Sequence, residues 1–249
     1  MILDPCELLE WDSNFFGFRI ARVRGNVLSR ESVQQIDDWC HQTDIRCLYF
    51  LCRDDEPVSS RLAEDNGFRL MDVRITFQYT NESSMLSMSE LPVSIRPFQP
   101  EDVGMLQTIA RESYHSTRFY FDANFPRHMS DLLYETWFKL SYEGYAQAVF
   151  VSEFEGMPVG YITCHLDEEV HIGKIGLVGV GYQAQGRGIG QMLVISAVDW
   201  ILSRGAQQVE VVTQGRNRAA QRLYQRCGFL TKAVELWFHK WYLSETLDE

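Results

Sequence analysis

The chain has 249 residues, 45% of them hydrophobic and 23% charged, which suits a globular protein with enough core for two domains. Its formal net charge of −11 argues against a general nucleic-acid binder, because such a protein needs a basic surface. The sequence also lacks an apolar run of about 18 residues and a signal-like start, so we expect neither a membrane span nor a signal peptide.

The first 80 residues predict a small α/β unit. Apolar and alternating patterns indicate a buried strand, a helix that starts at a serine, and a second strand, at 47–52, 59–68 and 72–79. The polar, serine-rich segment 81–92 follows and is interpreted as a linker. The predicted organisation is therefore an N-terminal domain of residues 1–80, a linker of residues 81–92 and a second domain of residues 93–249.

The second domain alternates predicted strands and helices. Strands are expected at 93–98, 174–180, 209–213 and 235–243, with a hairpin over 148–166 that turns at Glu155 and Gly156. Helices are expected at 100–113, 131–141, 186–205 and 217–229. This order predicts an α/β (α+β) fold.

One stretch of the N-terminal region repeats later in the chain. Residues 62–79 align without a gap with residues 223–240, and both read as helix, Gly-Phe, turn and strand. We interpret the N-terminal region as a shortened copy of the second unit. The copy has Ala63 where the second unit has Tyr224, and it lacks a glycine-rich loop. Two such units can also agree by chance, and this alternative stays open.

The segment 174–193 carries the clearest chemical signal. A predicted strand ends near Val180, and the glycine-rich loop 185–190 leads into a helix. Glycines allow close approach of the backbone, and the N–H groups at a helix start attract anions, so the loop suits a pyrophosphate.

Two other phosphate-binding patterns fit this segment less well. Residues 179–184 match the letters of a dinucleotide-binding motif, but the strand comes late in the domain and no acidic residue follows at a second strand end. A P-loop would end in Gly-Lys-Ser/Thr, and the lysine is absent. A tight turn without a ligand is the remaining alternative.

The same segment resembles the GNAT superfamily of N-acetyltransferases. Its signature Q/R-x-x-G-x-G/A is matched by residues 185–190. A second signature is matched at the right spacing by Asn217, Ala220, Tyr224, Gly228 and Phe229. The resemblance implies a GNAT fold, with a mixed central sheet flanked by helices, and an enzyme that uses acetyl-CoA.

The resemblance also implies roles for individual residues. The strand backbone at Val178, Gly179 and Val180 would lie along the pantetheine, with a main-chain N–H polarising the thioester carbonyl. The pyrophosphate would be held by Gln185, Gly186, Arg187, Gly188, Ile189 and Gly190. Asn217 would contact the CoA arm, and Tyr224 would protonate the leaving thiolate. A plain helix cap and a core-edge tyrosine are the alternatives for these two residues.

A narrower resemblance covers nearly the whole chain. Residues 9–23 and 116–141 are similar to segments of TDP-fucosamine acetyltransferases and related nucleotide-sugar N-acetyltransferases. This likeness implies a truncated GNAT-like N-terminal domain and a dTDP-linked amino-deoxy sugar as acceptor. Its phosphates would meet Arg118 or Arg127.

The same likeness suggests further acceptor-side residues. Phe119, Tyr120 and Phe121 would stack on the base or line the sugar pocket, although core packing is an equal alternative. The general base would be Asp72, with weaker alternatives at Glu112, Tyr114 and His115.

Several broader alternatives remain open. The acceptor could instead be a protein N-terminus, a lysine or a small amine, and a silent CoA-binding module is a third reading. The six cysteines contain no Cys-x-x-Cys pair and no histidine cluster has ligand spacing, so we expect reduced thiols in a cytoplasmic protein without a metal. A homodimer is compatible with the sequence.

Overall fold

The computed structural model describes residues 4–80, 93–167 and 169–242. The chain forms two compact units, and neither is continuous in sequence. Unit 1 contains the described residues of 1–74, 118–129 and 234–249, and unit 2 contains those of 75–117 and 130–233. The predicted linker 81–92 lies outside the described residues, and the predicted domain boundaries stay a prediction.

Unit 1 is a small sheet with helices packed on both faces. Its strands lie in the order β1 (Cys6–Leu8), β2 (Ile20–Val23), β3 (Cys47–Arg53) and β10 (Leu230–Trp241). The pair β2–β3 is parallel and the pair β3–β10 is antiparallel. Leu48, Phe50 and Cys52 alternate along β3 into one core, and Tyr49 on the opposite face is also fully buried, so both faces of β3 are covered. The helices of this unit are α1 (Glu10–Phe16), α2 (Arg30–Gln42), α3 (Pro57–Asp65) and α5 (Arg118–Phe121).

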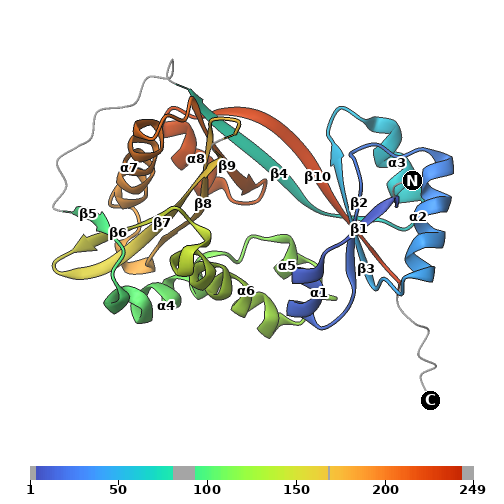
Figure 1. The fold of residues 1–249 in the computed structure, drawn as a ribbon, viewed down its shortest axis with the longest axis horizontal. Coiled ribbons are helices and arrows are strands. Elements are labelled where there is room, and N and C mark those ends of the chain that lie inside the picture. The colour runs from blue at the N-terminus through green and yellow to red at the C-terminus, as the bar shows by residue number, and fades with distance from the viewer. Residues whose placement is uncertain (1–3, 81–92, 168, 243–249) are drawn as a thin grey trace. The chain divides into compact units, whose positions relative to one another are not determined.

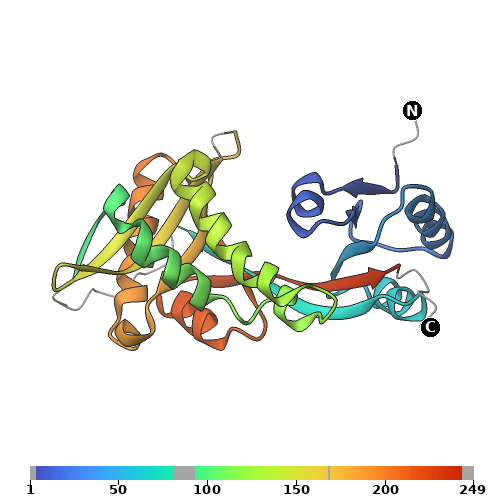
Figure 2. The same ribbon diagram turned by 90° about the horizontal axis from the view of Figure 1, so that it is seen from below.

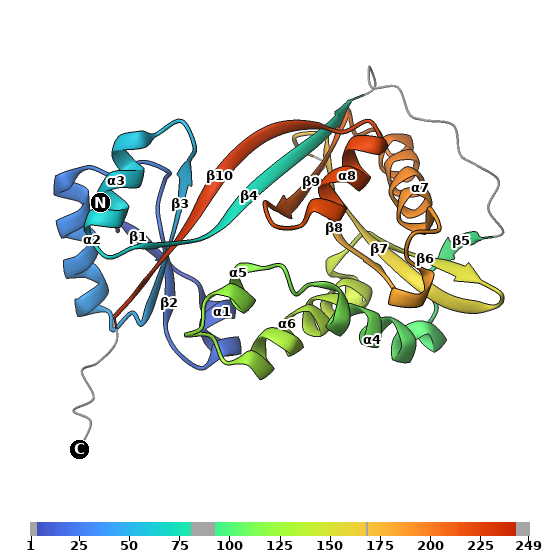
Figure 3. The ribbon, with the colours of Figure 1, turned by 180° about the vertical axis from the view of Figure 1, so that it is seen from behind.

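Unit 2 has a larger mixed sheet between two layers of helices. Its strands lie in the order β4 (Arg69–Thr80), β9 (Gln208–Gln214), β8 (Ile172–Val180), β7 (Met157–Asp167), β6 (Ala148–Phe154) and β5 (Ser94–Pro97). The helices α7 (Ile189–Ser203) and α8 (Arg218–Arg226) lie on one side of these strands (Figure 1). The helices α4 (Val103–Ser113) and α6 (Arg127–Leu140) lie on the other side (Figure 3).

The predicted internal repeat extends to whole elements. The strand β3 matches β9 at 7 residues, α3 matches α8 at 9 residues, and β4 matches β10 at 12 residues. Each helix is followed by a left-handed glycine, Gly67 with φ 80° or Gly228 with φ 85°, and then by a buried phenylalanine. The repeat is therefore structural as well as sequential.

The last strands of the two repeats are exchanged. The strand β4 follows α3 in the chain, yet it lies next to β9 of the second repeat. The strand β10 follows α8, yet it pairs with β3 of the first repeat along Glu235–Trp241. All three views show β4 and β10 running beside each other (Figure 2). Each unit thus needs a strand from the other repeat to complete its sheet.

Most sequence-predicted elements are confirmed, and the differences have local causes. The predicted α/β (α+β) class and the hairpin at Glu155-Gly156 are found, with both turn residues at positive φ. The helix predicted at 59–68 begins two residues earlier, at Pro57. Ser59 does not cap it, because its hydroxyl is buried and accepts the N–H of Leu28 at 2.9 Å. None of the described helices is long and apolar enough to cross a bilayer.

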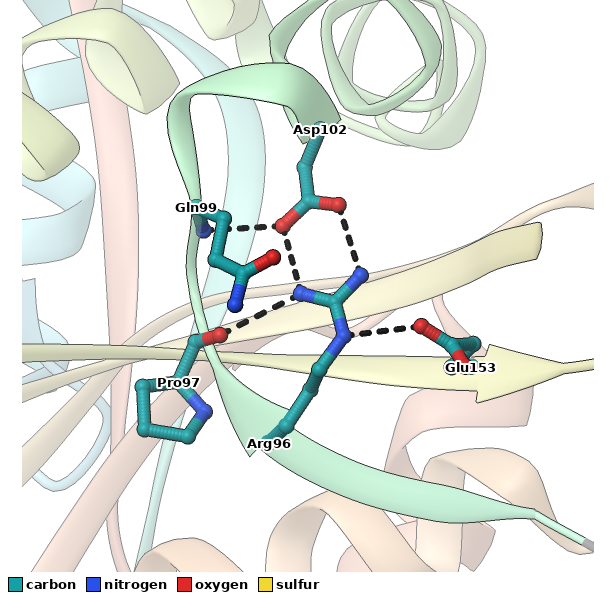
Figure 4. Close-up of polar contacts among 5 residues, drawn as sticks. All are labelled: Arg96, Pro97, Gln99, Asp102 and Glu153. Atoms are coloured by element: carbon teal, nitrogen blue, oxygen red, sulfur yellow. Dashed lines mark hydrogen bonds and ion pairs between the residues drawn. The ribbon is translucent and has the colours of Figure 1, made fainter. Parts of the chain in front are cut away.

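An ion-pair network fixes the start of unit 2 (Figure 4). The guanidinium of Arg96 donates to both carboxylate oxygens of Asp102, at 2.7 and 2.8 Å, and to Glu153 at 2.8 Å. Asp102 is buried and also accepts the backbone N–H of Gln99 at 2.9 Å. The Arg96 hydrogen bonds lower the pKa of Asp102. This bidentate contact ties β5 to α4 and to the hairpin strand β6.

Candidate active site

The strand β8 changes face at an irregularity next to β7. Ile162 pairs with Val178 and Cys164 pairs with Ile175, so β8 carries one extra residue between these pairs. The bulged N–H of Leu177 is satisfied by the hydroxyl of Thr163 at 2.8 Å. After the bulge, Val178 and Val180 pack on the α7 side, and Gly179 faces α4. The bulge therefore determines which residues of β8 pack against α7 and which face α4.

The same strand leaves β9 before either strand ends. Parallel pairing joins Ile172–Ile175 to Gln208–Val211, and the recorded pairs go no further among the described residues. The N–H of Gly181 donates to Val159 at 2.9 Å, so alternation places the bonds of Gly179 towards β7. The backbone groups of Val178 and Val180 then point to the side where β9 has separated. An extended ligand can add its own hydrogen bonds there.

The glycine-rich loop joins this strand end to α7. Gly186 and Gly188 have φ values of 76° and 79°, which favour glycine, and Gly188 is the N-cap of the helix. The side-chain amide of Gln185 donates to the carbonyl of Val180 at 3.0 Å and holds the loop against β8. Ile189 is buried in the core, which fixes the helix start.

The remaining loop residues differ in exposure. Arg187 is exposed, with its guanidinium 5.4 Å from the ring centre of Phe154. A Cβ on Gly190 would lie 3.3 Å from Leu223, so this glycine allows α7 and α8 to approach closely. The loop therefore combines a closely packed base with an exposed outer rim at 185–188.

The first repeat closes the corresponding helix start. Ser29 caps α2: its hydroxyl accepts the N–H of Ser32 at 3.1 Å, and its N–H donates to the Ser32 hydroxyl at 2.8 Å. In the second repeat, Gly188 has no side chain that could do this. The start of α2 is thus capped by side chains, whereas the start of α7 has no side-chain cap, and the N–H of Gln191 donates instead to the carbonyl of Gly188 at 3.0 Å.

Tyr224 lies in the core of unit 2. Its side chain is 5% exposed and packs against Phe77 and Phe229, with ring centres 5.9 Å away in each case. Burial, and to a lesser extent Cys227, raises its pKa above the ordinary tyrosine value. The phenol therefore keeps its proton at neutral pH.

Asn217 is a helix cap, as its sequence context predicts. Its side-chain oxygen accepts the N–H of Ala220 at 3.1 Å at the start of α8. This contact confirms the capping role and leaves the predicted CoA contact untested.

Arg118 lies in unit 1 within an aromatic cage. Its guanidinium carbon is 4.6 Å from the ring centre of Tyr49, 4.5 Å from Phe119 and 4.3 Å from Trp237. The buried Nε has no hydrogen-bond partner among the described residues. Three rings thus hold a cation in a fixed orientation with unused hydrogen-bonding capacity.

The other predicted acceptor residues divide between core and surface. Phe119 is buried and stacks on Phe16 at 5.5 Å, so it packs in the core of unit 1. Phe121 is 55% exposed. Tyr120 is half-buried beneath Arg127, whose guanidinium lies 4.3 Å from its ring centre.

Asp72 is buried on β4 in unit 1. It is 3% exposed, and its Oδ1 accepts the N–H of Val73 at 2.9 Å. Its predicted role as a base remains untested. Among the described residues there is no cluster of three side chains that could hold a metal ion.

Sequence reasoning missed several residues that the fold brings together. In unit 1, Asp122 Oδ2 accepts hydrogen bonds from His239 Nδ1 at 2.7 Å and Trp241 at 2.8 Å. Burial lowers the pKa of His239 to about 4, so the ring is neutral and its Nδ1–H is the donor. In unit 2, the hydroxyl of Tyr161 lies 3.1 Å from that of Tyr114, which the sequence offered only as a weaker alternative base. The alternation of residues along β10 predicts that His239 and Trp241 share a face of the strand, but it does not predict Asp122 as their partner.

The comparisons agree with this geometry. Residues 109–229 match the model of the acetyltransferase (GNAT) family. The chain is similar to spore coat polysaccharide biosynthesis protein SpsD of Bacillus subtilis, at 24% identity over 58% of this chain and 50% of that protein. It is also similar to a mycothiol acetyltransferase of Saccharomonospora viridis, at 25% identity over 73% of this chain and 61% of that protein. The matches thus span about half to three fifths of these two relatives.

A solved structure shows the fold over the whole chain. A GCN5-related N-acetyltransferase from Sphaerobacter thermophilus has a TM-score of 0.66 and 19% identity, and the likeness covers 95% of this chain and 76% of that one. The chain therefore has the GNAT fold, with a mixed sheet flanked by helices.

We expect the charge at position 188 to control CoA binding. The variants Gly188→Asp and Gly188→Asn have the same shape and both tolerate positive φ, but only aspartate adds negative charge at the proposed phosphate site. Titration calorimetry with acetyl-CoA should show at least a roughly tenfold weaker affinity for the aspartate variant than for the asparagine variant. Equal affinities in two folded variants would contradict a phosphate site at this helix start.

Proposed function

We propose that this acetyltransferase of the GNAT fold transfers the acetyl group of acetyl-CoA to the amine of a nucleotide-linked, dTDP-type amino-deoxy sugar. The proposal that acetyl-CoA is the donor rests on the separation of β8 from β9, beside the start of α7, which has no side-chain cap. Val178 and Val180 offer backbone hydrogen bonds to the pantetheine, and residues 185–190 offer N–H groups to the pyrophosphate.

The chemical step follows from these positions. The amine attacks the thioester carbonyl, whose oxygen is stabilised by a main-chain N–H of the Val178–Val180 segment. The tetrahedral intermediate collapses as the C–S bond breaks, and Tyr224 gives its proton to the leaving thiolate. The phenol carries its proton at neutral pH, as a donor to the thiolate must. Asp72 would take the proton that the amine loses.

The acceptor half rests on Arg118. Three aromatic rings surround its guanidinium, and its buried Nε has no hydrogen-bond partner among the described residues, so it suits an anionic group such as a diphosphate. The name of SpsD refers to polysaccharide biosynthesis, which agrees with a sugar acceptor. The names of the mycothiol acetyltransferases support a second candidate, a small non-nucleotide amine. Cytoplasmic location and a homodimer stay predictions from sequence.

A release assay for free CoA thiol tests both acceptor classes. We expect turnover with a dTDP-linked 4-amino-4,6-dideoxy sugar, and none above background with aminoglycosides, lysine peptides or peptide N-termini. Turnover of a small amine alone would move the acceptor to the second candidate. Absence of thiol release with every amine, despite acetyl-CoA binding, would favour the silent module.

We expect Tyr224→Phe to lower kcat by about 10²–10⁴-fold while both KM values change little, because the hydroxyl acts only in the transition state. The phenol of the wild type stays protonated past its ordinary pKa, so loss of its proton should not reduce the rate between pH 7 and 9. The two pH profiles should then be parallel in this range. Single-turnover rates within about twofold of each other would show that Tyr224 only packs.

We expect Arg118→Ala to raise the acceptor KM about 30-fold and to leave the acetyl-CoA KM unchanged, since a charge-assisted contact is worth about 2 kcal/mol. Arg118→Lys keeps the charge but lacks the planar guanidinium, so its acceptor KM should lie between those of the wild type and Arg118→Ala. Arg127→Ala is the matched control. A larger KM effect in the Arg127 variant would move the anion site there.

A further inference from the structure

A buried tyrosine closes the α4 side of β8 at the proposed thioester position. The side chain of Tyr161 is fully buried and lies beside Gly179 on the neighbouring strand. A Cβ added to Gly179 would lie 2.6 Å from Cε1 of Tyr161 and 3.2 Å from Cγ2 of Ile109. Glycine is needed here because the ring lies directly against the backbone of β8.

The ring of Tyr161 is held from two further directions. Its hydroxyl is 3.1 Å from the hydroxyl of Tyr114, at the end of α4. The ring of Phe138, on α6, is centred 4.3 Å away and is also fully buried. Tyr134 stacks on Tyr114 at 4.2 Å, which fixes the partner hydroxyl in turn. Rotation of Tyr161 would break a buried hydrogen bond and repack two helices, so the ring is a rigid wall.

The opposite face of β8 is also filled. Val178 and Val180 pack there on the core of α7, which includes the fully buried Leu193. A group attached to a thioester at Val178–Val180 therefore finds a packed core on one side and Tyr161 with Ile109 on the other.

We propose that Tyr161, fixed by Tyr114 and Phe138, limits the length of the acyl group, so that the site takes acetyl and rejects longer acyl thioesters. This inference rests on the proposed function, since it takes the thioester to lie at Val178–Val180. A pocket short by one methylene discriminates by roughly 10–200-fold, which is enough to select the donor. Tyr161 is then a residue that sets specificity and takes no part in the chemistry.

Titration calorimetry of the full chain with acetyl-, butyryl- and hexanoyl-CoA tests whether Tyr161 limits the length of the acyl group. Wild type should bind acetyl-CoA at least about tenfold more tightly than butyryl-CoA. In Tyr161→Ala the preference should fall to within threefold. Tyr161→Phe keeps the ring and should retain the wild-type preference. Tyr145→Ala removes a tyrosine that is 73% exposed and serves as the surface control.

A second variant guards against loss of folding. Ile109→Ala removes the other contact near Gly179 and should also reduce the preference for acetyl-CoA. This variant provides the test if Tyr161→Ala does not fold. An unchanged preference in every folded variant, or equal binding of all three thioesters to wild type, would overturn the inference. Failure of free CoA and of all three thioesters to bind would instead contradict the proposed function, and the inference would fall with it.

Discussion

Parallel pairing between β8 and β9 stops at Ile175 and Val211, although both strands continue. Backbone groups that lose a strand partner need another one, and Gln185 supplies it for the carbonyl of Val180 while Gln221 supplies it for the carbonyl of Gln214. The bulge after Ile175 has already reversed the faces of β8, so Val178 and Val180 remain anchored in the core while their backbone groups face the gap. Three features depend on this separation: the position of the glycine-rich loop, the place of Gly179 against Tyr161 and the proposed donor site.

The internal repeat shows which differences separate the two copies. Both have a strand, a helix with a left-handed glycine after it and a long final strand of equal length. The first copy caps its helix with the side chains of Ser29 and Ser32, whereas the second begins its helix at Gly188 without a side-chain cap. The first has Ala63 where the second has Tyr224. A serine pair and a missing phenol thus separate the first copy from the one that carries the proposed donor site, and each copy lends its last strand to the sheet of the other.

Sequence patterns predicted the elements better than their partners. The alternation of 148–166 and the Glu155-Gly156 turn predicted the hairpin, because both signals are local. The exchange of β4 and β10 could not be predicted, since either strand carries the apolar alternation that either sheet needs. The Asn217 cap was predicted from residue type and spacing, whereas Arg118 was named from the resemblance of residues 116–141, and its role stays a prediction. The cage partners Tyr49 and Trp237 come from distant strands, and only the fold brings them to Arg118.

Amide hydrogen exchange of the full chain, with and without saturating acetyl-CoA, tests the central claim most directly. A ligand that completes the free edge of β8 and the start of α7 must slow exchange of the N–H groups between residues 178 and 190. The corresponding segment of the first copy, residues 24–32, should exchange at the same rate in both samples, because it lacks the glycine-rich loop and its helix is capped by Ser29 and Ser32. Unchanged exchange at 178–190, or equal protection at 24–32, would contradict the account.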